Sequence, residues 1–212
     1  MVSKQPMKLI HLLSIPGAER ERKSVKSLMQ LRDLGFQYVA QINPPYEGEI
    51  PPGKYFNRPK GAYGCYKSHR AAVAESFSDF IMVCECDCTL LIPPKDFAKI
   101  VDEICEKMVK LELTCVAIGG LGASGQFVED LYRCRYVSAI HCLLYRNYCL
   151  NLLEDHPEPW LPYDYFLAET LGVEDKLAVT PARYAGYLPG VSLIDGDFKT
   201  DTALNGIGWV NL

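Results

Sequence analysis

The sequence predicts an α/β fold with a mostly parallel central sheet flanked by helices, and two observations carry this prediction. Apolar, strand-like segments alternate with amphipathic, helix-like segments through residues 1–120. A strand, a helix and a second strand also follow one another within residues 8–42, and such a unit pairs its two strands in parallel. A chain of 212 residues is long enough to bury the core of one such domain.

The first unit is marked clearly. Residues 8–15 (KLIHLLSI) predict a buried strand. Residues 19–34 predict a helix, because their apolar residues recur at helical spacing and Gly35 follows as a C-cap. Residues 36–42 then predict the second strand.

The next segment begins with an irregular loop. Residues 43–61 are dense in proline, glycine and aromatic residues, and loops of this length are usually functional or disordered. We predict a helix at about 63–77 and a strand at 80–84. The helix predicted at 94–110 has the clearest apolar face of the chain, and a strand at 114–118 follows it.

The remainder of the chain is less regular. We predict a strand at about 136–145, a short helix at 147–154, another helix after Pro162, and a tail broken by glycine and proline. No internal repeat or interdomain linker is evident, so residues 1–212 are expected to form a single domain.

Composition excludes several classes of function. A net charge of -4 does not favour nucleic acid as the main partner, and no apolar run approaches the roughly 18 residues that span a bilayer. The apolar start could pass for a signal peptide, but Pro16 follows it at once, and we expect a buried strand instead. Nine cysteines without a CxxC pair indicate reduced thiols in a cytoplasmic setting.

The stretch VCECDCTL, residues 83–90, alternates cysteines and carboxylates. In a continuous strand Cys84, Cys86 and Cys88 would share one face, and Glu85 and Asp87 the other. Ligands of open α/β sheets bind at the carboxyl ends of strands, where two carboxylates favour a divalent cation such as Mn²⁺ or Mg²⁺. Two alternatives stay open: a thiol-bound zinc ion, whose usual cysteine spacing is absent, and solvated acids at a strand end.

A second motif stands upstream, GAYGCYKSH, residues 61–69. The order of GCxxSH, a helix, an apolar strand and an acid-x-acid pair resembles glycosyltransferase family 25, which contains lipopolysaccharide and collagen galactosyltransferases. The start IHLLSIPGAERER is similar to that family's first strand and arginine-bearing turn. The segments 117–120, 162–164 and 190–194 match more loosely.

Two positions depart from the family's pattern. Cys86 replaces the middle acid of the acidic motif, and Leu193 stands where the late motif has aspartate. The donor sugar and the linkage are therefore not carried over. A compact, cysteine-rich, free-standing domain of this kind also resembles the capsid glycosyltransferases of large algal viruses.

The resemblance implies a single GT-A (Rossmann-like) domain over residues 1–212, with a nucleotide-binding half at 1–120 and an acceptor-side half at 121–212. It implies a metal-dependent, inverting glycosyltransferase of hexosyltransferase type, with a nucleotide-sugar donor, by default a UDP-sugar, and a glycan or glycoprotein acceptor. The location would be cytoplasmic, or the host cytoplasm if the chain is viral. Alternatives are a non-catalytic nucleotide-sugar or glycan-binding module, and an enzyme that processes its nucleotide without an acceptor.

The resemblance also suggests roles for individual residues. Asp87 is the expected direct metal ligand, and Glu85 would reach the metal through water or hold the ribose. The expected nucleotide-sugar contacts are Ser14, Ile15, Arg20, Lys60, Ser68, His69, Glu85 and Cys86. For the basic residues the alternative is solvated surface charge, and for His69 it is a packed, hydrogen-bonded side chain.

Asp164 is the candidate catalytic base for the acceptor hydroxyl, since the resemblance covers it and aromatic residues flank it. The alternative is that it caps the following helix. Asp155, Asp195 and Asp197 are further candidates, and one of the last two could complete the metal site.

The sequence GLGASG, residues 120–125, matches GxGxxG after a predicted strand. A dinucleotide site would need an acid about 20 residues later, and none is present there. We therefore expect a flexible loop near the acceptor.

Overall fold

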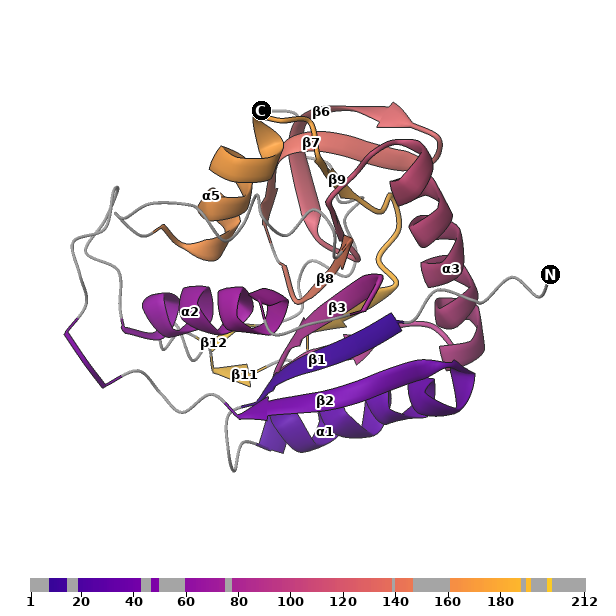
Figure 1. The fold of residues 1–212 in the computed structure, drawn as a ribbon. Coiled ribbons are helices and arrows are strands. Elements are labelled where there is room, and N and C mark those ends of the chain that lie inside the picture. Colours follow the sequence, from indigo (N-terminus) through magenta and orange to yellow (C-terminus); the bar gives the residue numbers. More distant parts are fainter. Residues whose placement is uncertain are drawn as a thin grey trace.

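A sheet of eight strands forms the centre of the molecule, and helices cover both of its faces (Figure 1). The computed structural model describes residues 8–14, 19–42, 47–49, 60–74, 78–138, 140–146, 161–187, 190–191 and 198–199.

The elements follow the expected alternation of strands and helices in the first half of the chain. Their bounds are β1 Lys8–Ser14, α1 Glu19–Leu28, η1 Met29–Leu34, β2 Phe36–Ile42, α2 Lys60–Ala74, β3 Phe80–Glu85, β4 Cys88–Leu90, α3 Pro94–Lys110, β5 Cys115–Ala117, β6 Leu121–Val128, β7 Leu131–Ser138, β8 Cys142–Arg146, α5 Tyr163–Leu167, η3 Ala168–Gly172, β9 Leu177–Val179, β10 Ala185–Tyr187, β11 Gly190–Val191 and β12 Phe198–Lys199.

The order of strands in the large sheet is β2-β1-β3-β8-β5-β9-β7-β6. Strands β1, β2 and β3 pair in parallel, as do β5 and β9, whereas β7 and β8 run against their neighbours. Six of the eight strands therefore point the same way. The predicted fold class, α/β with a mostly parallel central sheet flanked by helices, is confirmed.

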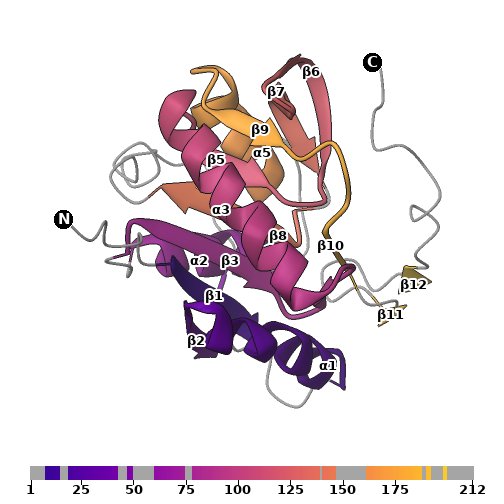
Figure 2. The ribbon, with the colours of Figure 1, turned by 90° about the vertical axis from the view of Figure 1, so that its right-hand side faces the viewer.

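Each face of the sheet has its own core, because successive side chains of a strand point to opposite faces. Ile81 and Val83 of β3 pack with α2 and α5, whereas Met82 and Cys84 pack with α1 and α3. Figure 2 shows α3 lying across the second of these faces. The strand β3 is thus buried on both sides, as its unbroken apolar sequence predicts.

Several elements match their predictions closely. Strand β2 and helix α3 have the predicted bounds, and β1 covers the predicted strand up to Ser14. The first helix tightens into the 3₁₀ helix η1 before it ends at Gly35, whose φ of 89° is the left-handed conformation expected of a glycine C-cap. Helix α2 begins at Lys60, three residues before its predicted start at 63.

Two predictions for the second half are wrong. The strand expected at 136–145 is two strands, because β7 belongs to a hairpin with β6 whereas β8 inserts between β3 and β5. GLGASG is neither a loop nor the start of a dinucleotide site, because residues 121–128 form β6 and no helix follows. The helix predicted at 147–154 lies outside the described residues.

VCECDCTL is also not one continuous strand. A turn at Cys86 and Asp87 separates β3 from β4, and β4 leaves the large sheet to pair with β10. The prediction that Cys86 shares a strand face with Cys84 and Cys88 is therefore wrong. Within the described residues no helix has the length and apolar character to cross a membrane.

Candidate functional site

The candidate site lies at the carboxyl ends of β1 and β3. The chain places β2 on one side of β1 and β3 on the other, so the strand order reverses between β1 and β3. Open α/β sheets bind ligands at such a reversal, outside the carboxyl ends of the strands. Glu85, the last residue of β3, lies opposite Leu13 of β1 at this position.

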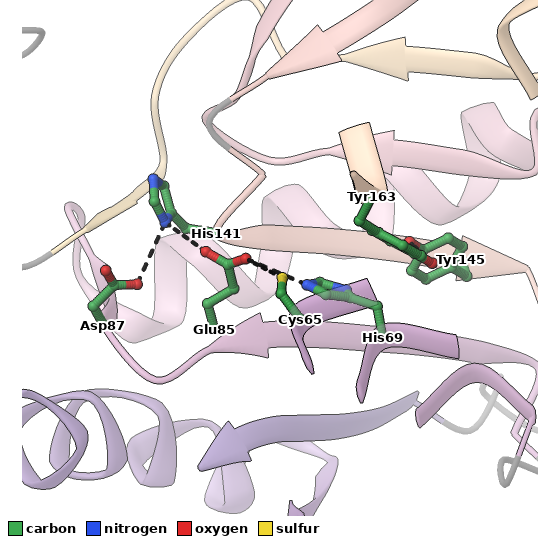
Figure 3. Close-up of polar contacts among 7 residues, drawn as sticks. All are labelled: Cys65, His69, Glu85, Asp87, His141, Tyr145 and Tyr163. Atoms are coloured by element: carbon green, nitrogen blue, oxygen red, sulfur yellow. Dashed lines mark hydrogen bonds and ion pairs between the residues drawn. The ribbon is translucent and has the colours of Figure 1, made fainter. Parts of the chain in front are cut away.

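Three side chains meet there, Glu85, Asp87 and His141 (Figure 3). The Nδ1 atom of His141 lies 3.0 Å from an Oε atom of Glu85 and 3.4 Å from an Oδ atom of Asp87. One imidazole nitrogen thus faces both carboxylates of the acid-x-acid motif. All three side chains are mostly buried, with exposed fractions of 19%, 13% and 19% for Glu85, Asp87 and His141.

The backbone fixes this arrangement. Glu85 ends β3 on the face that carries Ile81 and Val83, and His141 directly precedes β8, the antiparallel neighbour of β3. The amide of Glu85 donates a hydrogen bond of 2.9 Å to the carbonyl of His141. Asp87 comes to the same side because the turn after β3 redirects the chain.

Each charge in the group stabilises its neighbour. Burial alone lowers the pKa of His141, but hydrogen bonds with Asp87 and Glu85 outweigh it and raise the pKa to about 10. Burial raises the pKa of Glu85, but hydrogen bonds with His141 and His69 outweigh it and hold that pKa well below its usual value. At neutral pH the metal-free group is therefore an imidazolium between carboxylates.

Helix α2 supports the other oxygen of Glu85. Cys65 and His69 are four residues apart and so share a face of the helix. The Oε1 atom of Glu85 accepts a hydrogen bond of 3.5 Å from Cys65 and lies 3.4 Å from Nε2 of His69. The two residues therefore fix the orientation of the Glu85 carboxylate.

His69 is held from behind by aromatic rings. Its exposed fraction is 0%, and its ring stacks on that of Tyr163 with centroids 4.3 Å apart. The Tyr163 hydroxyl lies 3.0 Å from the hydroxyl of Tyr145 (Figure 3). The structure thus places His69 as a packed and hydrogen-bonded residue beside the candidate site.

Asp164 lies in the first turn of α5, next to Tyr163. One of its oxygens accepts a 2.8 Å hydrogen bond from the hydroxyl of Tyr136, and the other accepts one from the Tyr165 amide. Burial first, then Glu85, Asp164 and Asp87, raise the pKa of the Cys65 thiol well above its usual value. The Asp164 carboxylate thus adds to the negative potential that Glu85 and Asp87 exert on this thiol.

The donor set fits a divalent cation. The ligand atoms of Glu85, Asp87 and His141 all lie within 4.8 Å of one another. Two carboxylate oxygens suit Mn²⁺ and Mg²⁺, and an imidazole nitrogen disfavours Mg²⁺, which prefers oxygen ligands. The ligand atoms of Cys65, His69 and Glu85 satisfy the same spacing. We interpret Cys65 and His69 as the support of Glu85, because they contact its Oε1 atom, whereas His141, which also faces Asp87, contacts its Oε2 atom.

The structure does not bring the other predicted residues into this group. Ser68 is half-buried and, as the neighbour of His69, faces another direction on the helix. Cys86 is buried in the turn. Lys60 is exposed at the start of α2, and its ammonium donates to the carbonyl of Glu47.

Six predicted positions cannot be placed by their side chains. Ile15, Asp155, Asp195 and Asp197 lie outside the described residues. The backbones of Ser14 and Arg20 belong to β1 and α1, but their side chains are not described.

Sequence reasoning missed His141, Cys65 and Tyr136. His141 stands more than 50 residues after the acidic motif, and only the pairing of β8 with β3 brings it there. Cys65 was visible inside GCYKSH, four residues before His69, and that helical spacing could have linked the two.

No family model and no curated protein matches the chain. Among solved structures, A197 from STIV is 9% identical over 84% of this chain and 83% of that chain, with a TM-score of 0.46. S. aureus TarS is 12% identical over 86% of this chain and 37% of TarS, with a TM-score of 0.48. A glycosyltransferase involved in the glycosylation of the major capsid of PBCV-1 is 12% identical over 83% of each chain, with a TM-score of 0.47. At these values the similarity assigns neither a family nor an activity to this chain.

Proposed function

We propose that this protein transfers a sugar, a hexose in the first instance, from a nucleotide-sugar to a glycan or glycoprotein acceptor with the help of a divalent cation. The observation that supports this proposal most directly is the meeting of Glu85, Asp87 and His141 at the reversal of strand order. A UDP-sugar is the first candidate donor and Mn²⁺ the first candidate cation. The same proposal includes a cytoplasmic location for the protein and inversion of configuration at the transferred sugar. It also assigns nucleotide binding to residues 1–120 and the acceptor side to residues 121–212.

The cation would be held by Glu85, Asp87 and His141. When bound, it would supply Lewis-acid stabilisation of the charge that develops on the leaving diphosphate. Asp87 and His141 would be ligands on one side of the Glu85 carboxylate. Cys65 and His69, on its other side, would keep that carboxylate turned toward Asp87 and His141. Two carboxylates without a cation would repel a diphosphate, which is the electrostatic reason to expect metal dependence.

Asp164 is the proposed base. Its carboxylate would accept the proton of the acceptor hydroxyl as the sugar is transferred, and the Tyr136 hydroxyl would hold it in position. A base that acts on the acceptor in a single displacement is consistent with inversion. Ser14, Ile15, Arg20, Lys60, Ser68 and Cys86 stay proposed nucleotide contacts on the strength of the sequence resemblance.

The test is a screen of donors with the full chain. UDP-sugars and other nucleotide-sugars would be incubated with Mn²⁺, Mg²⁺ or EDTA, and the released nucleoside diphosphate measured. We expect release from at least one donor, its loss in EDTA, and a drop of roughly 100-fold or more in Asp87→Asn.

Asp130→Asn is the matched control, because Asp130 is 88% exposed and, among the described residues, forms a 3.5 Å ion pair with Lys107. It should leave release unchanged. A donor that binds but releases no nucleoside diphosphate, even when candidate acceptors are added, would instead indicate a binding module. A folded protein that neither binds nor turns over any donor would contradict the proposal.

A further inference from the structure

Behind the carboxylates, three cysteines come together in the core. Cys84, Cys88 and Cys142 have exposed fractions of 0%, 0% and 1%. Their sulfur atoms all lie within 4.8 Å of one another, and those of Cys84 and Cys142 are 3.8 Å apart. We call these three side chains the thiol cluster.

The fold builds this cluster from three segments. Cys84 and Cys142 are directly opposed in β3 and β8, and the hydrogen bond from the Glu85 amide to the His141 carbonyl makes them the close, non-hydrogen-bonded type of pair. Cys88 opens β4, and its carbonyl accepts a hydrogen bond from the hydroxyl of Ser24 on α1. All three thiols belong to the core on the α1 and α3 face.

The cluster and the candidate site are arranged back to back. Cys84 is followed by Glu85, Cys88 is preceded by Asp87, and Cys142 is preceded by His141. Cys84 and Glu85 are adjacent in β3 and therefore point to opposite faces of the sheet. The three sulfur atoms belong to the core on the α1 and α3 face, whereas the Glu85 carboxylate contacts Cys65 and His69 of α2 on the other face, and Asp87 and His141 lie beside it. Each residue of the thiol cluster is thus a sequence neighbour of one residue of the candidate cation site.

A buried cysteine ordinarily serves as a small apolar side chain. Cys105 does so in the same core, on α3, and among the described residues it joins no such group of sulfur atoms. The thiol cluster differs because Cys142 comes from a distant part of the sequence and meets Cys84 and Cys88 at ligand spacing. Two sulfur atoms bound to one ion at about 2.3 Å each lie roughly 3.8–4.0 Å apart, which matches the 3.8 Å between Cys84 and Cys142.

We propose that Cys84, Cys88 and Cys142 bind one soft d¹⁰ cation, Zn²⁺ or Cu⁺, as thiolates. Binding forms three metal–sulfur bonds and releases the three thiol protons to solvent. An apolar, all-sulfur pocket selects soft cations over Mn²⁺ and Mg²⁺. Among the described residues no fourth side-chain ligand joins the group, which suits three-coordinate Cu⁺ and would leave Zn²⁺ to recruit a fourth ligand.

Such an ion would be structural. Burial prevents it from meeting a substrate, and it would hold β3, β4 and β8 together behind Glu85, Asp87 and His141. This site does not depend on the proposed glycosyl transfer. A protein that transferred no sugar could still hold the ion.

The first test measures metal uptake by the reduced, full-length wild type. Native mass spectrometry after exposure to Zn²⁺ or to Cu⁺, in separate samples, should find one tightly held equivalent. Titration with Cd²⁺ should produce a thiolate-to-metal charge-transfer absorption that saturates at one equivalent. A folded, reduced wild type that takes up none of the three ions through sulfur overturns the proposal, whatever the variants do.

The second test assigns the site. Cys142→Ala should lose the Cd²⁺ absorption and one metal equivalent, whereas Cys105→Ala, a buried cysteine of the same core, should keep both. Asp87→Asn should also keep both, which separates this site from the carboxylate group. Uptake that survives in folded Cys142→Ala or Cys88→Ala, or is lost equally in Cys105→Ala, contradicts the assignment. Donor release is assayed separately, so the two proposals can fail independently.

Discussion

At the scale of single residues, the candidate site depends on mutual stabilisation of opposite charges. His141 is held as an imidazolium by two carboxylates, and Glu85 is held as a carboxylate by two histidines. Asp87 and Glu85 were found from the acid-x-acid pattern at the end of an apolar strand. His141 was not, because a histidine inside the strand predicted at 136–145 carries no local signal of its partner.

The first prediction concerns pH and the metal-free protein. The pKa of His141 is raised from 6.5 to about 10, so its contribution to stability is complete below pH 6.5 and is lost as the pH rises toward 10. The pKa of Glu85 is lowered, so its contribution is present above pH 4.5 and is lost as the pH falls through the lowered value. Wild type should therefore exceed Glu85→Gln in stability most clearly between pH 4.5 and 6.5.

Urea unfolding at a series of pH values, with EDTA present, measures this margin. Glu103→Gln serves as the control, because Glu103 is half exposed and, in the part of the chain that the structure describes, forms a 3.8 Å ion pair with Lys99 on the same helix. It should track wild type at every pH. A margin for Glu85→Gln that is constant from pH 5 to 10, or that grows toward pH 10, would count against the charge pairing.

The second prediction tests whether Asp164 acts as a catalytic base or as a metal ligand. Asp164→Asn should leave the dissociation constant for a nucleoside diphosphate with Mn²⁺ within about twofold, because its carboxylate is not in the metal set. It should lower transfer by roughly 100-fold to 10,000-fold, the usual contribution of a general base. Tyr136→Phe should lower transfer less, since it removes the hydroxyl that donates the 2.8 Å hydrogen bond and leaves the Asp164 carboxylate in place.

Calorimetry and initial rates with saturating donor give the two quantities. Rates that fall in Asp164→Asn only because nucleotide binding weakens would show that Asp164 is a binding or helix-capping residue.

At the scale of elements, the sequence predicted what periodicity controls. Strands β1, β2 and β3 and helices α1 and α3 follow from apolar runs and helical spacing. The turn inside VCECDCTL could not be predicted in this way, because the alternation of cysteines and acids fits a continuous strand equally well. The insertion of β8 between β3 and β5 depends on long-range pairing that no local pattern encodes. The site is therefore half visible in sequence.

The third prediction concerns the end of β5, where Gly119 has a φ of +86°. A Cβ atom there would lie 2.0 Å from the carbonyl oxygen of Ala185, which belongs to β10. Gly35 has a similar φ of +89° but open space around it. Gly35→Ala should cost roughly 1–2 kcal/mol of unfolding free energy from backbone strain alone, and Gly119→Ala about 1–3 kcal/mol more from the clash.

Thermal and urea unfolding of the two variants measure the difference. Equal losses would mean that β10 does not pack against the end of β5 in solution.

At the scale of the whole molecule, one sheet joins the two halves of the chain. Strand β8 from the second half lies between β3 and β5 of the first, and it carries His141 to the acids. The two cores divide the functions that we propose. The α2 and α5 face holds the carboxylate–imidazole group, and the α1 and α3 face holds the thiol cluster (Figures 1 and 2).

The fourth prediction follows from this interleaving. Mn²⁺ with UDP should slow amide hydrogen exchange in residues 83–88 and in residues 140–143 together, because one cation would join both segments. The β6–β7 turn at 129–130 is exposed and should not change. Asp87→Asn should remove the slowing in both segments. Slowing confined to one segment would contradict a ligand set that spans the two halves.

The central claim is that Glu85, Asp87 and His141 form a cation site that binds a nucleoside diphosphate. Titrating UDP by calorimetry, with Mn²⁺ and with EDTA, tests it most directly. We predict binding that requires Mn²⁺, that weakens at least about tenfold in Asp87→Asn and in His141→Gln, and that Asp130→Asn leaves unchanged. Binding that neither EDTA nor Asp87→Asn alters, or no binding of UDP or any other nucleoside diphosphate by the folded wild type, would contradict the claim.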